Sequence, residues 1–114
     1  MKTVKRGEGR AVFQGDLMMI RADKIPAEAT RAKTNVVAFS ETHHHHVATG
    51  CEVLTMPGDP MTLFLKAKGK HIDIVHQRPF DTHETIRLLT KPGDTFKLRR
   101  QREWTPEGWR RVED

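Results

Sequence analysis

Short apolar runs separated by turn residues make up most of the chain, and no stretch of a dozen residues repeats apolar positions with the 3.6-residue period of a helix. Runs of this kind, rich in valine, isoleucine and threonine, are typical of β-strands. The pattern predicts strands over residues 17–20, 36–39, 52–56, 62–67, 71–76, 85–90 and 95–102. Short strands spaced roughly ten residues apart favour a mainly β fold, either a single small β-barrel or a β-sandwich.

Proline and glycine mark the connections between these strands. The segment Pro57-Gly58-Asp59-Pro60 is predicted to join two strands as a hairpin. Tight reversals are also expected at residues 68–70 and 91–94. Near the end of the chain, Thr105 suits a helix N-cap and Pro106 suits the first helical position, which predicts a short C-terminal helical turn.

The first ten residues offer little to bury. Val4 is their only large apolar side chain after Met1, and basic residues are frequent among them. We therefore expect residues 1–10 to be a flexible basic N-terminal arm and residues 11–114 to be a single β domain.

Length and composition narrow the classes of protein further. With 114 residues, of which 36% are hydrophobic, the chain can build one modest core. Cys51 is the only cysteine, which excludes an internal disulfide framework. No apolar run approaches the roughly 18 residues of a membrane span, and the N-terminus lacks the apolar stretch of a signal peptide. The sequence favours a cytoplasmic protein without a membrane partner.

The formal net charge of +5 comes from local clusters of basic residues. The clusters comprise Lys2, Lys5, Arg6, Arg10, Lys66, Lys68 and Lys70. These side chains are candidate contacts for nucleic acid or for neighbouring subunits in a lattice. A solvated surface without a partner is the alternative, because clustered lysine commonly does no more than face water.

Four consecutive histidines, His43–His46, are the most distinctive chemical feature. On a strand, residues two apart share a face, so one alternate pair can point inward while the other points outward. Two such imidazoles, joined by a histidine or carboxylate from another strand, can hold a divalent metal such as zinc, manganese or iron. The alternatives are an exposed loop that chelates metal adventitiously and buried histidines held by hydrogen bonds.

Several short motifs occur in a fixed order over residues 13–114. They are Gln14-Gly15-Asp16, Ile25-Pro26, Glu41 to His46, Thr82-His83-Glu84, Pro92-Gly93 and Arg100-Gln101-Arg102-Glu103-Trp104-Thr105-Pro106. In this order they resemble a family of small, largely uncharacterised proteins of phages, prophages and bacteria. The C-terminal segment is the most specific part of the resemblance.

The resemblance implies a metal held by His44 and His46, with Glu41 nearby and His83 as a later partner. The chain departs from the family pattern at His43, where glycine is usual. It also lacks a second histidine after the His-Glu element, and His76 is a candidate substitute. The layout is also similar to a cupin or jelly roll, in which two histidines, a glutamate and a later histidine hold a metal inside the β fold.

Strand alternation supports a different pair. If the strand containing Val37 and Phe39 continues unbroken, His43 and His45 face the core with them. A β-bulge before the histidines would restore the inward position to His44 and His46. The sequence leaves both phases open.

Together these features predict a small metal-binding β protein of phage or mobile-element type, whose reaction the sequence does not assign. One alternative is a virion structural protein that decorates or stabilises a capsid, as a homo-oligomer or lattice subunit. Such a protein would be found in the virion rather than the cytoplasm. Another alternative is an accessory protein that makes weak contacts with nucleic acid through its basic clusters.

Overall fold

The structure is a computed structural model that describes residues 1–7, 11–14, 17–38, 45–76, 85–100, 102–105 and 108–111. Over these ranges the regular elements are all strands, which confirms the expectation of a mainly β fold. Accordingly, the described part of the chain has no helix that could span a membrane.

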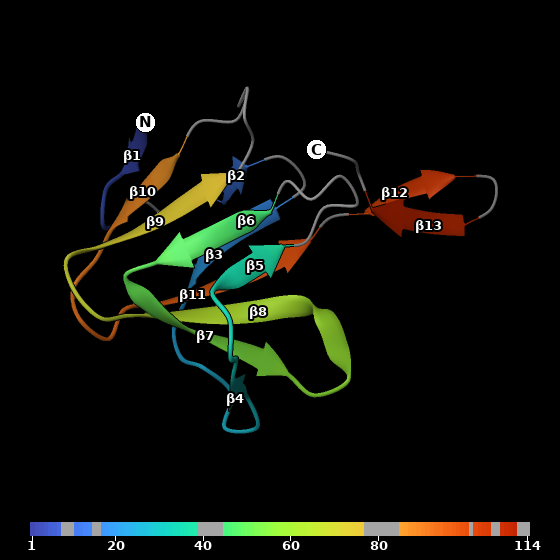
Figure 1. Cartoon of the computed structure of the whole chain (residues 1–114), viewed down its shortest axis with the longest axis horizontal. Coiled ribbons are helices and arrows are strands. Elements are labelled where there is room, and N and C mark those ends of the chain that lie inside the picture. The colour runs from blue at the N-terminus through green and yellow to red at the C-terminus, as the bar shows by residue number, and fades with distance from the viewer. Residues whose placement is uncertain are drawn as a thin grey trace.

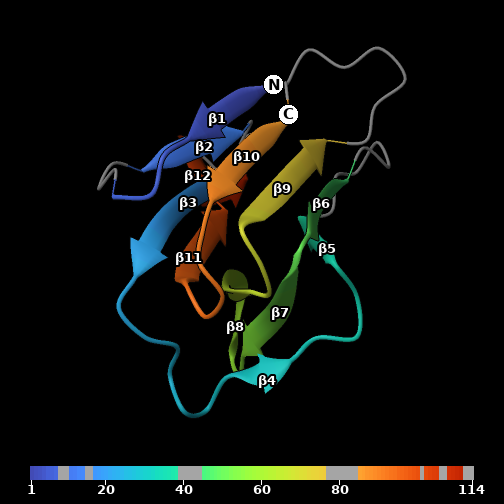
Figure 2. The same cartoon turned by 90° about the vertical axis from the view of Figure 1, so that its left-hand side faces the viewer.

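Two sheets form the body of the molecule (Figure 1). The five-stranded sheet has the order β1 (Lys2–Val4), β10 (Ile86–Leu89), β9 (His71–His76), β6 (His46–Thr49) and β5 (Val36–Ala38). The six-stranded sheet has the order β2 (Val12–Gln14), β3 (Leu17–Ala22), β11 (Thr95–Arg100), β8 (Asp59–Ala67), β7 (Cys51–Met56) and β4 (Thr30–Arg31). All neighbouring strands are antiparallel except β1, which runs parallel to β10 (Figure 2).

The core draws on both sheets, because alternate residues of each strand point to the same side. From the five-stranded sheet it includes Val4, Val37, Ala48, Ile72, Ile74, Ile86 and Leu88. From the six-stranded sheet it includes Val12, Leu17, Met19, Val53, Leu65, Ala67, Phe96 and Leu98. This shared apolar cluster holds the two sheets together.

The predicted turns take two different roles. The turn at Pro57–Pro60 joins β7 to β8 as the expected hairpin. The reversals at 68–70 and 91–94 instead carry the chain from one sheet to the other, because they connect β8 to β9 and β10 to β11. Gly50 makes a third crossing, from β6 to β7. Hydrogen bonds link these three crossing turns at one end of the molecule, which we call the turn end.

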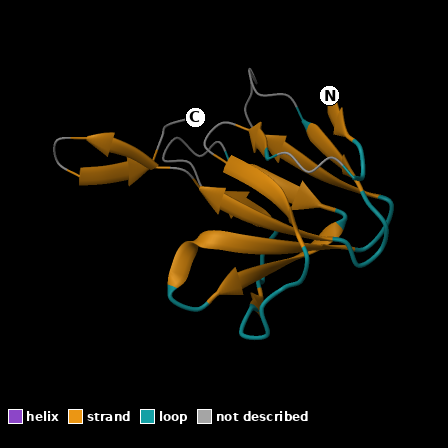
Figure 3. Ribbon diagram, turned by 180° about the vertical axis from the view of Figure 1, so that it is seen from behind, coloured by secondary structure: helices purple, strands orange, loops and turns teal. Residues whose placement is uncertain are grey.

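The predicted C-terminal helical turn is wrong. Residues Arg102–Thr105 form β12 and Gly108–Arg111 form β13, with Thr105 opposite Gly108 in the register. This two-stranded sheet stands apart from the other two (Figure 3). A threonine followed by proline fits a turn between strands as well as a helix start, since proline fixes the backbone angle that both require.

Within the N-terminal segment 1–10 that was expected to be a flexible arm, the structure describes residues 1–7 and contains a strand at Lys2–Val4. Residues Lys2–Val4 form β1 at the edge of the five-stranded sheet, and only 3% of Val4 is exposed. A single inward valine suffices for a three-residue edge strand, whose other side chains face water. Arg10 lies outside the described residues.

Candidate functional site

Two buried histidines face each other across neighbouring strands of the five-stranded sheet. His46 is the first residue of β6, His76 is the last residue of β9, and the register sets them opposite each other. Their rings are stacked, with centroids 4.2 Å apart and planes 5° from parallel. His46 is 0% exposed and His76 is 2% exposed, so this histidine pair lies in a part of the protein that excludes water.

Gln14 reaches the histidine pair from the other sheet. Its Oε1 lies 2.7 Å from Nδ1 of His46, and its Nε2 donates a 2.9 Å hydrogen bond to the backbone oxygen of Ile74. Because a carbonyl oxygen can only accept, the amide nitrogen must face Ile74 and Oε1 must face the imidazole. The hydrogen of neutral His46 is thereby placed on Nδ1, and its lone pair on Nε2.

The histidine pair marks the end of the sheet opposite the turn end, which we call the histidine end. Ala38, the last residue of β5, pairs with His46. Ile86, the first residue of β10, pairs with Ile74 of β9. The segments that connect β5 to β6 and β9 to β10 therefore both leave and rejoin the sheet at the histidine end.

These two connecting segments carry the other predicted ligands. Glu41 and His44 belong to the first and His83 to the second, and all three lie outside the described residues. Over the ranges that the structure does describe, no three histidine, cysteine or acidic side chains come together as a metal cluster. The described part supplies two imidazoles and the glutamine that orients one of them.

His46 is buried and His45 is half-buried, which is the phase implied by the family resemblance. The alternation that favoured His43 and His45 assumed one strand from Val37 onward. Instead β5 ends at Ala38, a separate strand begins at His46, and the pairing of these two strands shifts in register between Val36 and Ala38. A new strand sets its own alternation, so the phase of Val37 does not carry over.

Gln14 was not among the predicted ligands, and His76 was named only as a substitute for the missing second histidine. Gln14 belongs to the short Gln-Gly-Asp motif, and His76 closes the predicted strand 71–76. The signal for His76 was its position at the end of an alternating apolar strand, two residues beyond Ile74. The signal for Gln14 was a polar residue in phase with the buried Val12.

The basic residues of the predicted polyanion contacts gather mainly at the turn end. Lys66, Lys68 and Lys70 are exposed and lie at the end of β8 and in the turn that follows it. The amide of Thr90 donates to the oxygen of Lys70, which brings the exposed Lys91 of the next crossing turn to the same place. Lys2 is exposed on β1, at the edge of the five-stranded sheet.

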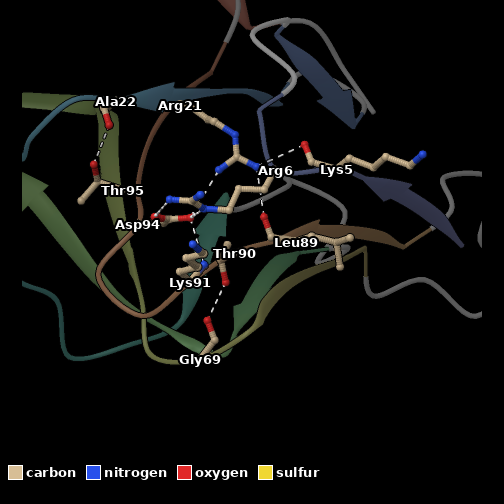
Figure 4. Close-up of polar contacts among 10 residues, drawn as sticks. All are labelled: Lys5, Arg6, Arg21, Ala22, Gly69, Leu89, Thr90, Lys91, Asp94 and Thr95. Atoms are coloured by element: carbon tan, nitrogen blue, oxygen red, sulfur yellow. Dashed lines mark hydrogen bonds and ion pairs between the residues drawn. The ribbon is translucent and has the colours of Figure 1, made fainter.

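An ion-paired clasp attaches the N-terminal segment to this end (Figure 4). Arg6 donates two hydrogen bonds to the carboxylate of Asp94, at 2.7 and 3.1 Å. Arg21 donates to the backbone oxygens of Lys5 and Leu89, and its guanidinium lies 4.8 Å from the ring centroid of Phe96. The predicted contacts Lys5 and Arg6 are therefore held against the crossing turns.

Because of the clasp, the stability of the protein should decrease as the pH falls into the acid range. The hydrogen bonds from Arg6, with a further one from the amide of Lys91, lower the pKa of Asp94 to about 2. Because this folded-state value lies below that of an unfolded aspartate, the stabilisation is complete above about pH 5 and is lost as the pH falls toward 2. We expect Asp94→Asn to reduce the free energy of unfolding at neutral pH by about 1 kcal/mol, since Arg6 is half exposed and solvent screens the pair.

Urea unfolding of the wild type and of Asp94→Asn, at neutral pH and at about pH 3, tests this expectation. The difference between the two proteins should shrink at the lower pH. Asp23→Asn, at an exposed acid in the connection after β3, is the control. A difference that stays the same at both pH values would contradict the role of the Asp94 carboxylate.

Cys51 does not offer a reactive thiol. Burial raises its pKa to about 11, against a smaller opposite effect of Lys68. A thiol with this pKa is protonated at neutral pH and is a poor nucleophile and metal ligand. Among the described residues, the histidine end therefore offers the better donors for a metal.

Comparison with known proteins connects this chain to a protein family. No curated protein and no solved structure matches it. A family model described as "Domain of unknown function (DUF8820)" matches residues 13–101. Because this match covers most of the chain, the protein belongs to the DUF8820 family.

Proposed function

We propose that the protein binds a divalent metal ion at the histidine end, with His46 and His76 as the inner ligands. The observation that carries this proposal is the buried, stacked histidine pair. The ring centroids lie 4.2 Å apart, so one metal could reach both imidazoles at about 2.1 Å once one ring turns out of the stack and both in-plane lone pairs point to the metal. The hydrogen bond to Gln14 supports the proposal, because metal-binding histidines commonly donate their second nitrogen to a fixed acceptor.

The remaining ligands would come from the two connecting segments whose flanking residues lie at the histidine end. Glu41, His44 and His83 are the candidates, and the family resemblance favours the same three. Imidazole and carboxylate donors suit zinc, manganese or iron. Three or four protein ligands with one open position would allow the metal to activate water or polarise a substrate oxygen.

We also infer that the two sheets form a small β-sandwich of jelly-roll type, since each contributes one face to the shared core. The role of a virion decoration or stabilising protein stays a prediction beside metal binding. The β12–β13 hairpin fits that role, because it pairs with no other described strand and an isolated hairpin gains stability from a partner.

Metal binding is tested with untagged protein stripped by a chelator and titrated with zinc, manganese or iron(II). We expect one ion per chain by elemental analysis, and a rise in the melting temperature of about 10 °C when free metal reaches about 100 times the dissociation constant. His76→Gln should abolish the rise, because glutamine keeps a polar side chain at this buried position but is a weak ligand.

The matched control is His71→Gln at the other end of β9, where the side chain is 46% exposed. This control should bind metal as the wild type does. Substoichiometric metal in the wild type, or equal losses from His71→Gln and His76→Gln, would show that the histidines chelate adventitiously. The His43/His45 double alanine variant should leave binding nearly intact, whereas a His44 variant should weaken it.

A further inference from the structure

The outward face of the six-stranded sheet is unusually apolar. Leu17 and Met19 of β3 are buried in the core, so Met18 and Ile20 between them point away from it. The register extends this outward set to neighbouring strands. Its apolar members are Phe13, Met18, Ile20, Leu54 and Phe64. A sheet with one face on the core normally presents polar residues to water on the other, so this face is a candidate binding surface.

Phe13 and Phe64 occupy different depths on this face. Phe13 lies opposite Met18 on the edge strand β2 and is 50% exposed. Phe64 is only 6% exposed, although it does not belong to the core cluster between the sheets. In the register it stands between Leu54 and Lys97, on the same outward row. Phe13 therefore offers an accessible ring, whereas the ring of Phe64 is covered and presents little surface to a partner.

Basic side chains cross the same face. Lys97 and Arg99 alternate with the buried Phe96 and Leu98 along β11, so both point outward about 7 Å apart. Lys66 pairs with Thr95, two residues from Lys97, which makes the two lysines diagonal neighbours about 7–8 Å apart. Lys66, Lys97 and Arg99 thus form a line of cations at nearly even spacing.

Among the described residues of this face, cations outnumber acids. Arg31 lies opposite Leu54 at the outer edge and adds a further cation. Two acids lie among them: Glu52, opposite Lys66 in the register, and Asp59, whose carboxylate interacts with Lys97 and Arg99. A second copy of the chain laid face to face would bring these cations together, which disfavours self-association through this surface. The face is complementary to an anionic partner with flat apolar groups.

We propose that the outward face of the six-stranded sheet binds single-stranded nucleic acid. An unpaired strand combines regularly spaced phosphates with exposed bases, and it binds where a basic track runs beside side chains on which bases can stack. Phosphates follow Lys66, Lys97 and Arg99, while bases lie on Phe13 and the neighbouring Met18 and Ile20. Duplexes keep their bases inside the helix and match only the cations.

The lysines of the turn end extend this track. Lys66 lies both on the outward face and at the start of the turn cluster, since Lys68 and Lys70 follow it along the chain. A strand that passes over β11 and β8 can therefore continue across the crossing turns. This surface lies on the opposite sheet from the histidine pair, and the inference does not depend on metal binding.

The test is a fluorescence anisotropy titration of the full chain with labelled oligothymidylate and oligouridylate over a series of salt concentrations. Phe13→Leu keeps an apolar side chain but removes the ring, and it should weaken binding about tenfold. The Lys97→Ala/Arg99→Ala variant should weaken binding and reduce the slope of log affinity against log salt by about 0.7 for each phosphate that is no longer neutralised. Phe13→Trp should restore or exceed wild-type affinity.

Two control variants test whether binding depends on this surface or only on the overall positive charge and exposed apolar side chains of the protein. Lys2→Ala removes an exposed charge from β1 at the edge of the five-stranded sheet, and Leu89→Ala truncates an exposed leucine on the same sheet. Both should bind nearly as the wild type does. Unfolding curves confirm that each variant is folded.

Four results would overturn the proposal. They are no binding of either oligonucleotide at low salt, equal affinity for a duplex of the same length, equal losses from Lys97→Ala/Arg99→Ala and from Lys2→Ala, and full binding by Phe13→Leu. Concentration-dependent dimers in sedimentation velocity that Phe13→Leu abolishes would also overturn it, since a second copy would then cover the face.

Discussion

Replacing Gly50 with alanine is expected to destabilise the protein by about 3–5 kcal/mol. Gly50 links β6 to β7 with a φ of +82°, in the left-handed region that side chains disfavour. A Cβ atom at this position would lie 2.6 Å from the backbone oxygen of His71. That oxygen belongs to the first residue of β9, so the overlap can be relieved only by moving the backbone of a central strand. Urea unfolding at neutral pH measures the loss.

Gly58 supplies the matched control. It also has a positive φ, of +78°, but a Cβ atom there would meet nothing within 4 Å. Gly58→Ala carries only the conformational penalty, about 1–2 kcal/mol. The difference between the two variants therefore isolates the close approach of Gly50 to β9. Equal losses of stability would show that a small backbone shift relieves this approach.

The long strands were predictable because each alternates buried and exposed residues over four or more positions. The run His71–His76 buries Ile72, Ile74 and His76, and it was predicted with its observed bounds. The run Thr95–Arg100 buries Phe96 and Leu98 in the same manner. A period of two over six residues is specific enough to identify a strand without knowledge of its neighbours.

Three of the shortest strands, β1, β2 and β4, were not predictable, because their partners define them. β1 and β2 have three residues each and β4 has two, too few for a period to appear. β1 becomes a strand because Lys2–Val4 pairs in parallel with Ile86–Leu88, more than 80 residues further along the chain. Local composition contains no trace of such a distant pairing, and the same residues alone are typical of a flexible arm.

The candidate site was only partly predictable, because it also depends on distant strand pairings. The histidine run was conspicuous, but its inward residue depends on where one strand ends and the next begins. The partnership of His46 with His76 depends on the pairing of β6 with β9, and Gln14 arrives from the other sheet. These relations are tertiary, so residue types and spacing could indicate the chemistry of the site without its full membership.

Removing the amide of Gln14 is expected to have the second-largest effect on stability. Gln14→Met preserves length and apolar volume but removes both hydrogen bonds of the side chain. The Nδ1 hydrogen of His46 and the backbone oxygen of Ile74 then lose this partner inside the core. Each such loss is worth about 1–3 kcal/mol, and we expect a decrease in the free energy of unfolding of about 3 kcal/mol. Gln14→Ala should add the further loss of packing.

Gln14 could support the fold without fixing which nitrogen of His46 carries the hydrogen. The tautomer of His46 therefore distinguishes a structural role of Gln14 from a role in orienting a metal ligand. In the wild type, long-range nitrogen–proton NMR of the imidazole should show neutral His46 with its hydrogen on Nδ1, because Gln14 offers only an oxygen to that atom. Gln14→Met should give a mixture of tautomers and weaken metal binding by about 10–100-fold, the usual effect of losing a partner that orients a ligand. A hydrogen on Nε2 in the wild type would contradict the orientation derived for Gln14. Wild-type metal affinity in Gln14→Met would limit this residue to supporting the fold.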